Sequence, residues 1–514
     1  MTTRLLALLI LLGSIWVAPA QEVEVQEHIL DNGMRLLLVP REGDPNISCG
    51  WVARVGSVNE RPGVTGVAHL FEHMMFKGTH TLGTKDIDRD LELIAKLDDL
   101  KAQIREEEAV LVEAYRVGQI EDPTAADNRS ERHQELLAEF ENLLKVQSEL
   151  LVKDEFTRIY TSEGGSGMNA FTSNDMTAYF INVPANKLEL WFWMESDRLA
   201  NPVFREFYTE RDVVREERRL RTDSTPTGRI NEQFDAMFWQ ASPYSWPVIG
   251  WSNDVENITR EEALEFFGTY YAPNNLTMVL VGEFEPEVAI ALAEKYLSRL
   301  PRGDKAPPPM RTREIKQLAE KRMIAYAETR PTVRIRYHTV PDAHVDEPPL
   351  LVLGSILNGR TGRFFKSLVL EQQLAVQASG GVNGLKYDGM FELVGVARDP
   401  NQLLDLEQGL YEQMELLKEE LVTERELQKI KNQQLAGDFR RLESKSGLMI
   451  QLLQYEALGE WQNINRFSER IQAVTAEDVQ KVVRKYFTRE NRTVGLYYPK
   501  DFVPATEDSE GEVE

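Results

Sequence analysis

One segment of the sequence recurs, and this repeat limits the chain to folds built from two related units. Each copy predicts a Thr-capped helix, an Asn turn and a strand. Chance resemblance between two amphipathic helices is the alternative, but the matches continue past the helix into the turn. We therefore predict a duplication in which residues 258–278 align without gaps on residues 474–494, through the pairs Thr259/Thr475, Glu261/Glu477, Tyr270/Tyr486, Tyr271/Phe487, Asn275/Asn491 and Thr277/Thr493.

A Pro-rich stretch lies between the two copies. Residues 301–312 have the composition of an extended linker, and they divide the chain into residues 21–300 and 313–503. A chain of 514 residues is also too long for one hydrophobic core. Both halves mix helical patterns with alternating strand patterns, so we predict an α+β fold of duplicated domains, each with helices packed on an antiparallel sheet. The predicted strands are residues 28–39, 48–55, 278–281, 332–337 and 494–498.

The two ends of the chain predict export and a disordered tail. Residues 1–20 have a charged start at Arg4, an apolar stretch and a small-residue cleavage site, as signal peptides do. A membrane anchor is the weaker alternative, because an apolar run of 13 residues is shorter than the roughly 20 needed to span a bilayer. We expect a periplasmic or secreted protein with no membrane span after signal cleavage. Residues 504–514 are acidic and predict disorder.

Charge and cysteine content exclude some functions. The net charge of -24 argues against a nucleic-acid partner. It favours cationic peptides only weakly, because acidic surfaces often serve solubility alone. Cys49 is the single cysteine, so the chain cannot form an internal disulfide.

Residues 86–153 form a charged segment with two helical seams. Leucines and other apolar residues recur at spacings of three and four in both arms, which predicts an antiparallel helical hairpin that projects from the first domain as an insertion. A contact for a partner or substrate and a decoration without function are equally good interpretations, because helical pairing alone specifies no ligand.

The strongest chemical signal is His69-Leu70-Phe71-Glu72-His73, within a predicted helix over residues 67–77 that ends at Gly78. Histidines four residues apart share one helical face and can bind one metal ion. Glu72 leans toward the same face and can act as a base. The alternative is a pair of ordinary surface histidines. The other five of the seven histidines lack metal-ligand spacing.

A catalytic zinc ion needs a third protein ligand and an open position for water. Residues 210–220 predict a helix whose buried face is marked by Val213, Val214 and Leu220. Glu217 lies three or four residues from all of them, and a carboxylate on an apolar face needs a cation. We therefore predict one Zn²⁺ ion per chain, with His69, His73 and Glu217 as ligands. A closed structural zinc site, with four protein ligands, fits poorly.

Glu210 lies two turns before Glu217 and would line the same helical face. We expect it to support a metal ligand through a hydrogen bond. The alternative is an exposed Glu in a salt bridge, because Glu is common on helix surfaces.

Three segments together resemble the pitrilysin/insulinase family of zinc metallopeptidases. Residues 66–79 resemble its inverted zinc motif H-x-x-E-H, and residues 210–217 resemble its third-ligand helix. Residues 169–173 resemble its edge strand, which implies that Asn169 and Ala170 hold an extended substrate. The 143 residues between His73 and Glu217 exceed the usual gap, and the predicted hairpin accounts for the difference.

The resemblance implies an endopeptidase that hydrolyses peptides or unfolded polypeptides, with Glu72 as general base. One departure matters. Active family members place an Arg and a Tyr near the zinc ion where this chain has Val369 and Val376. A homologous subunit in a heterodimer would then supply this pair, and a homodimer is the other assembly that we consider. The alternative is a noncatalytic peptide-binding or assembly subunit.

Overall fold

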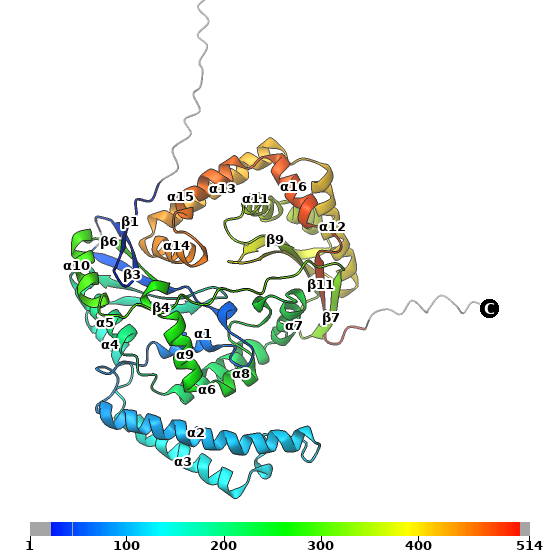
Figure 1. The fold of residues 1–514 in the computed structure, drawn as a ribbon. Coiled ribbons are helices and arrows are strands. Elements are labelled where there is room, and N and C mark those ends of the chain that lie inside the picture. Colours follow the sequence, from blue (N-terminus) through cyan, green and yellow to red (C-terminus); the bar gives the residue numbers. More distant parts are fainter. Residues whose placement is uncertain (1–21, 44, 504–514) are drawn as a thin grey trace, which may run out of the picture.

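The structure, a computed structural model, describes residues 22–43 and 45–503 and contains two mixed β-sheets (Figure 1). The first sheet has the strand order β1-β2-β6-β3-β5-β4, and the second has the order β7-β11-β8-β10-β9. The strands are β1 (Gln26–Ile29), β2 (Arg35–Pro40), β3 (Asn46–Ala53), β4 (Ser166–Thr172), β5 (Thr177–Pro184), β6 (Leu276–Gly282), β7 (Lys321–Ala327), β8 (Thr332–Thr339), β9 (Ala375–Gly384), β10 (Gly389–Ala397) and β11 (Arg492–Pro499).

The two sheets share one topology, which confirms the predicted α+β duplication. Strands β2, β6, β3, β5 and β4 have β7, β11, β8, β10 and β9 as counterparts, and only β1 has none. The predicted antiparallel pairing is wrong at one place in each sheet, because β2 pairs with β6 and β7 pairs with β11 in parallel. The helices between these strands provide the crossover that parallel neighbours require.

The repeated segment adopts the predicted structure in both halves. Thr259 and Thr475 each cap a helix and form a capping box with the acidic residue three positions on. The side-chain amide of Asn275 donates to the carbonyl of Tyr270 at 2.8 Å, and Asn491 donates to Tyr486 at 2.7 Å. The same local bonds therefore connect helix to strand in each half.

The prediction of one strand over residues 28–39 is wrong. The chain turns between β1 and β2, where Gly33 has a φ of 90° and its N–H donates to the carbonyl of Leu30. A Cβ at this φ would be strained, so glycine suits the turn. The signal Asp31-Asn32-Gly33 was present in the sequence.

The helices cover the two sheets and connect their strands (Figure 1). In the first half they are α1 (Val67–Met74), α2 (Ile87–Arg116), α3 (Glu131–Leu150), α4 (Glu155–Ser162), α5 (Leu188–Ala200), α6 (Phe207–Arg218), α7 (Gly228–Phe238), α8 (Ser252–Asn257), α9 (Arg260–Tyr270) and α10 (Pro286–Leu297). In the second half they are α11 (Glu347–Leu357), α12 (Leu403–Glu419), α13 (Glu424–Glu443), α14 (Lys445–Leu458), α15 (Asn463–Ala473) and α16 (Ala476–Tyr486).

Each half lends one helix to the sheet of the other half. Helix α14 packs on β3 and β6 of the first sheet, where Met449 and Leu453 join its buried side chains in one cluster. Helix α7 packs on β7 and β11 of the second sheet, where the Phe234 ring contacts that of Tyr497. The two helices are topological counterparts, so the halves are joined by a reciprocal exchange.

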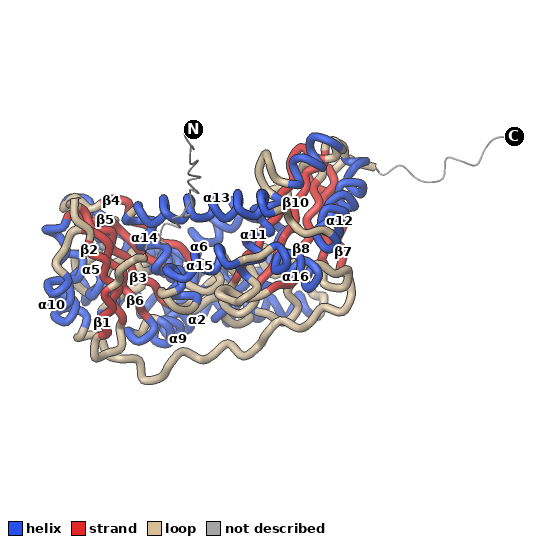
Figure 2. The backbone as a smooth tube through the Cα atoms, turned by 90° about the horizontal axis from the view of Figure 1, so that it is seen from above, coloured by secondary structure: helices blue, strands red, loops and turns tan. Residues whose placement is uncertain are grey.

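A long irregular segment connects the halves. It runs from the end of α10 to the start of β7 along the outside of the molecule (Figure 2). The proposed boundaries at residues 300 and 313 stay a prediction. The predicted signal peptide, residues 1–20, and the predicted tail, residues 504–514, lie outside the described residues. Within the described part of the chain, none of the helices combines the length and apolarity that a membrane crossing requires.

Helices α2 and α3 form the predicted hairpin, which lies as a separate layer beneath the first half (Figure 1). Leu100, Ile104 and Leu136 form its own small core. The hairpin does not simply project, because the Phe140 ring packs on Tyr208 of α6, and the Tyr208 hydroxyl donates to Asp98 at 2.7 Å. That the hairpin is an insertion stays a prediction.

Candidate zinc site

The helix that carries the two histidines is held at both ends. Gly66 precedes α1, which ends at Met74 and not at the predicted residue 77, and Gly78 lies after the turn that follows. The two glycines have φ values of 90° and 95°, and a Cβ on either would meet a backbone carbonyl oxygen within 2.6 Å. Only glycine fits such positions. The buried Glu60 carboxylate accepts from the N–H groups of Gly66 and Ala68, which lie at the positive end of the helix.

His69 and His73 of α1 and Glu217 of α6 converge on one point. Their ligand atoms all lie within 4.8 Å of one another, and no other such group of His, Cys, Asp and Glu occurs among the described residues. Oε2 of Glu217 lies 3.8 Å from Nε2 of His69 and 3.4 Å from Nε2 of His73. Ligands of a tetrahedral zinc ion, at bond lengths of about 2.0–2.1 Å, lie roughly 3.3–3.5 Å apart. This donor set therefore fits zinc.

Both histidines are placed to present Nε2 to a metal ion. Burial, with the neighbouring His73 and Arg221, lowers the pKa of His69 to about 3, which keeps its ring neutral. Nδ1 of His73 lies 3.4 Å from Oε2 of Glu210, so Glu210 can orient the ring. Lys77 contacts the other oxygen of Glu210. Burial opposes a charge on Glu210, but its contacts with His73 and Lys77 lower its pKa overall.

The predicted buried face around Glu217 is wrong in part. Val213 and Leu220 do not mark a buried face, because they are 43% and 63% exposed, and only Val214 is buried. The α-helix ends at Arg218 and continues as a π-type turn, Arg219–Asp223, which changes the direction of the later side chains. Glu217 nevertheless lies beside both histidines.

Glu72 lies on α1 between the two histidines, next to the edge strand β4. Burial raises its pKa, while the nearby Thr172 and His73 oppose the rise. A raised pKa suits a carboxylate that must take up and release a proton. Thr172 ends β4, so the candidate base lies against the outer strand of the first sheet.

Strand β4 presents an unpaired edge close to the candidate base. Asn169 and Ala170 pair with Phe180 and Tyr179 of β5, and no described strand pairs on their other side. Asn169 is exposed, whereas Ala170 is 9% exposed. Oδ1 of Asn169 accepts from the N–H of Ala170 at 2.9 Å. An extended peptide can add to such an edge.

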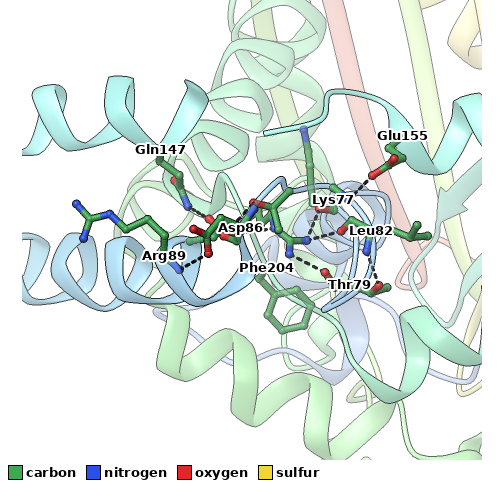
Figure 3. Close-up of polar contacts among 12 residues, drawn as sticks. Lys77, Thr79, Leu82, Asp86, Arg89, Gln147, Glu155 and Phe204 are labelled. Atoms are coloured by element: carbon green, nitrogen blue, oxygen red, sulfur yellow. Dashed lines mark hydrogen bonds and ion pairs between the residues drawn. The ribbon is translucent and has the colours of Figure 1, made fainter. Parts of the chain in front are cut away.

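A buried polar network supports α1 and α6 from the side of the hairpin (Figure 3). Arg205, just before α6, is 1% exposed and pairs with Asp90 of α2 at 2.5 Å. It also donates to the carbonyls of Thr79 and Leu82, in the turn that follows α1. Gln147 of α3 donates to Asp90 at 2.9 Å. One guanidinium thus joins the hairpin, the turn after α1 and the start of α6.

Sequence reasoning missed Arg205, Lys77, Thr172 and Arg221. Arg221 pairs with Oε1 of Glu217 at 2.5 Å, through an i,i+4 spacing visible in the sequence. The other three contact residues distant in sequence, so no local pattern identifies them. Val369 is 8% exposed on a π-type turn, Phe365–Glu371, and Val376 is 47% exposed on β9.

Two family models match the chain. The model described as "Insulinase (Peptidase family M16)" matches residues 35–116 and 140–250, and the "Peptidase M16 inactive domain" matches residues 257–434. Together they cover most of both halves. The chain belongs to the insulinase family, M16. Its likeness to M16 runs through the H-x-x-E-H helix and the α6 carboxylates, and the match to the first half is interrupted only at residues 117–139, the tip of the hairpin.

Relatives and solved structures of M16 span the same length. The chain is 26% identical to "Zinc protease PqqE" of Helicobacter pylori over 499 residues, which is 96% of this chain and 97% of that protein. The crystal structure of a protease from Helicobacter pylori superposes with a TM-score of 0.75 and 25% identity, over 93% of this chain and 99% of that one. The first half of the periplasmic protease PqqL from Escherichia coli superposes with a TM-score of 0.66 and 18% identity, over 93% and 92% of the two chains.

Proposed function

We propose that this M16 protein is an exported zinc-dependent endopeptidase that hydrolyses peptides or unfolded polypeptides. The observation that carries the proposal is the convergence of His69, His73 and Glu217, with Glu72 between the two histidines and β4 alongside. A purely structural zinc site does not require a free carboxylate next to an unpaired strand edge. Two relatives that match nearly the whole length of this chain are named zinc proteases, which supports the same conclusion.

The residues of this chain divide the work of peptide hydrolysis. Bound zinc would supply Lewis acidity toward water and the substrate carbonyl. Glu72 takes a proton from the attacking water and returns it to the leaving amine. Glu210 orients His73, and the edge of β4 at Asn169 and Ala170 binds the substrate as an added strand.

A homologous partner subunit completes this site. Valines at positions 369 and 376 offer no donor to the substrate carbonyl, and loss of one such donor costs about 10²- to 10³-fold in kcat. The partner we propose carries Arg and Tyr at the aligned positions and no H-x-x-E-H. Export to the periplasm or outside the cell is supported by the signal-like residues 1–20 and by the periplasmic relative PqqL.

The valines also favour a second candidate function, a noncatalytic peptide-binding or assembly subunit. Glu72→Gln separates the two. We measure turnover of a denatured peptide mixture and zinc content, with and without the partner, and use the exposed Glu216→Gln as the matched control. A peptidase loses about 10²- to 10⁴-fold in turnover with its zinc retained, while the control keeps full activity. Equal turnover in both variants, or no turnover in the wild type under either condition, removes the peptidase proposal.

A further inference from the structure

The second sheet ends at a strand whose outer edge is free. Strand β7 is the last in its sheet, and the described residues place no strand beyond it. The segment before β7 does not fill the position, because Gln317 donates to the carbonyls of Glu490 and Arg492 and so lies at the start of β11. In both views β7 lies at the margin of the molecule (Figures 1 and 2).

The equivalent strand of the first half, β2, shows that the outer edge of β7 can pair with a further strand. Arg35 of β2 pairs with Thr277, and Lys321 of β7 pairs with Thr493, its counterpart in the repeat. Counting along the strands, Leu38 and Ile324 therefore occupy the same place. In the first half this edge is covered by β1, which pairs antiparallel with β2.

Apolar side chains of β7 lie in solvent. Leu38 is fully buried in a cluster with Ala289 and Ala293 of α10, the helix that follows β6, whereas Ile324 is 59% exposed at the equivalent place, because no helix of the described residues follows β11. Tyr326, on the same face of β7, is 48% exposed, and Leu404 of α12 is 56% exposed. An unpaired strand edge beside exposed apolar groups readily pairs with another strand.

We propose that β7 is a self-association surface and that it pairs antiparallel with β7 of a second copy, around a two-fold axis at Ile324. In that register Ile324 faces its own counterpart, and Arg322 faces Tyr326 of the second copy. The first is an apolar cross-strand pair. In the second, the guanidinium of Arg322, which Glu407 already binds, can stack on the tyrosine ring. On the other face Lys321 lies opposite Ala327 and Met323 opposite Ala325, so no like charges meet.

The chemistry of the strand favours a second copy over an unrelated strand. Residues 321–327 are complementary to themselves when reversed, as an isologous interface requires. The strand has one lysine, Lys321, and its Nζ donates to the carbonyl of Met237 at 2.8 Å within the same chain, so it does not extend over the free edge. This inference does not depend on peptidase activity, since it uses no residue of the zinc site.

Cross-linking tests the register. Cys49 is the only cysteine and is buried, so an introduced thiol reacts alone. At the proposed axis Cβ atoms of two Ile324→Cys chains lie about 5 Å apart. In two Arg322→Cys chains the introduced Cβ atoms lie roughly 14 Å apart, because residue 322 faces residue 326 of the second copy, four residues along the strand. With a short thiol cross-linker, Ile324→Cys gives a covalent dimer and Arg322→Cys does not. Equal cross-linking of both, or of neither, overturns the proposed register.

Sedimentation of the uncross-linked protein tests the association itself. We expect the full chain to sediment at twice its monomer mass, and Ile324→Lys to sediment as a monomer with unchanged zinc content and circular dichroism. Val288→Lys, a change of the same kind at a residue 53% exposed on α10, keeps the dimer. A monomeric wild type, as expected if β7 receives a strand of another protein, contradicts the proposal. So does a dimer that survives Ile324→Lys.

Discussion

Helices α1 and α11 occupy the same place in the two halves and both bury apolar side chains, but only α1 also carries the polar residues of the candidate site. Helix α1 presents His69, Glu72 and His73 to the site, whereas α11 is apolar, with Leu353 and Leu357 fully buried among its core residues. Both lie between equivalent strands of equivalent sheets. The scaffold therefore permits a metal site without requiring one, and a few side chains decide which half carries it.

The halves differ also in the segments that connect these helices to the next strand. The second half returns from α11 to β9 through the short turn Phe365–Glu371. In the first half α2, α3 and α4 lie between α1 and β4, and Arg205 connects α2 to the turn that follows α1. The half with the candidate chemistry is thus also the half with additional support around it.

The largest expected effect is the loss of a ligand from the first half only. His73→Ala removes one of the three proposed zinc ligands, so we expect zinc content to fall from the proposed one ion per chain to near zero and peptide turnover to fall to background. Zinc content is measured by atomic absorption after dialysis. His344→Ala in the second half is the control and keeps both. A loss of zinc in the His344 variant would break the contrast between the halves.

The hairpin contact provides the second test. Asp90→Asn leaves the buried charge of Arg205 without its partner, and such a loss costs about 3–5 kcal/mol. We expect the free energy of unfolding in urea to fall by that amount. The exposed Asp88→Asn, on the same helix, changes it by less than about 0.5 kcal/mol. Similar values for the two variants would show that Asp90 is not a structural contact of this half.

Glu210→Gln should have a smaller effect, confined to the metal. The variant keeps its size but loses the charge beside His73, and partners of this kind are worth about 10- to 100-fold in metal affinity. Zinc affinity is measured by competition with a chelator. Glu424→Gln is the matched control, because Glu424 lies exposed on α13, the counterpart of α6. If the zinc affinity of Glu210→Gln is unchanged, Glu210 does not orient His73 as we propose.

Local patterns in the sequence predicted most of the site and much of the fold. Two histidines four apart define one helical face wherever the helix lies, so His69, Glu72 and His73 follow from spacing alone. The prediction of Glu217 from spacing relies in part on Val213 and Leu220, which are both exposed. Leu220 lies in the π-type turn, where the assumed α-helical period no longer holds, whereas Val213 lies within α6 and faces solvent. Local patterns also predicted the capped helices of the repeat, since a cap is made within four residues.

Contacts between distant segments could not be predicted in the same way. An amphipathic pattern shows that α7 and α14 each have a face to bury, but not that each buries it on the sheet of the other half. The parallel pairing of β2 with β6 has the same origin, because strand order depends on residues far apart in sequence. Arg205 and Asp90 resemble ordinary surface charges until the fold brings them together.

The smallest effect concerns Arg221, which has no role in the sequence prediction. Its guanidinium holds one oxygen of Glu217 and leaves the other toward the histidines, but its side chain is 75% exposed. An exposed ion pair is worth about 0–1 kcal/mol, so Arg221→Ala should weaken zinc binding by no more than about fivefold. Arg219→Ala removes a similar exposed pair with Glu216, on the other side of the helix, and should leave zinc affinity unchanged. The comparison is made in low salt, where surface pairs are least screened. A loss of zinc affinity above tenfold in Arg221→Ala would mean that Arg221 positions Glu217 more strongly than its exposure suggests. Equal losses in Arg221→Ala and Arg219→Ala would mean that Arg221 does not position Glu217 at all.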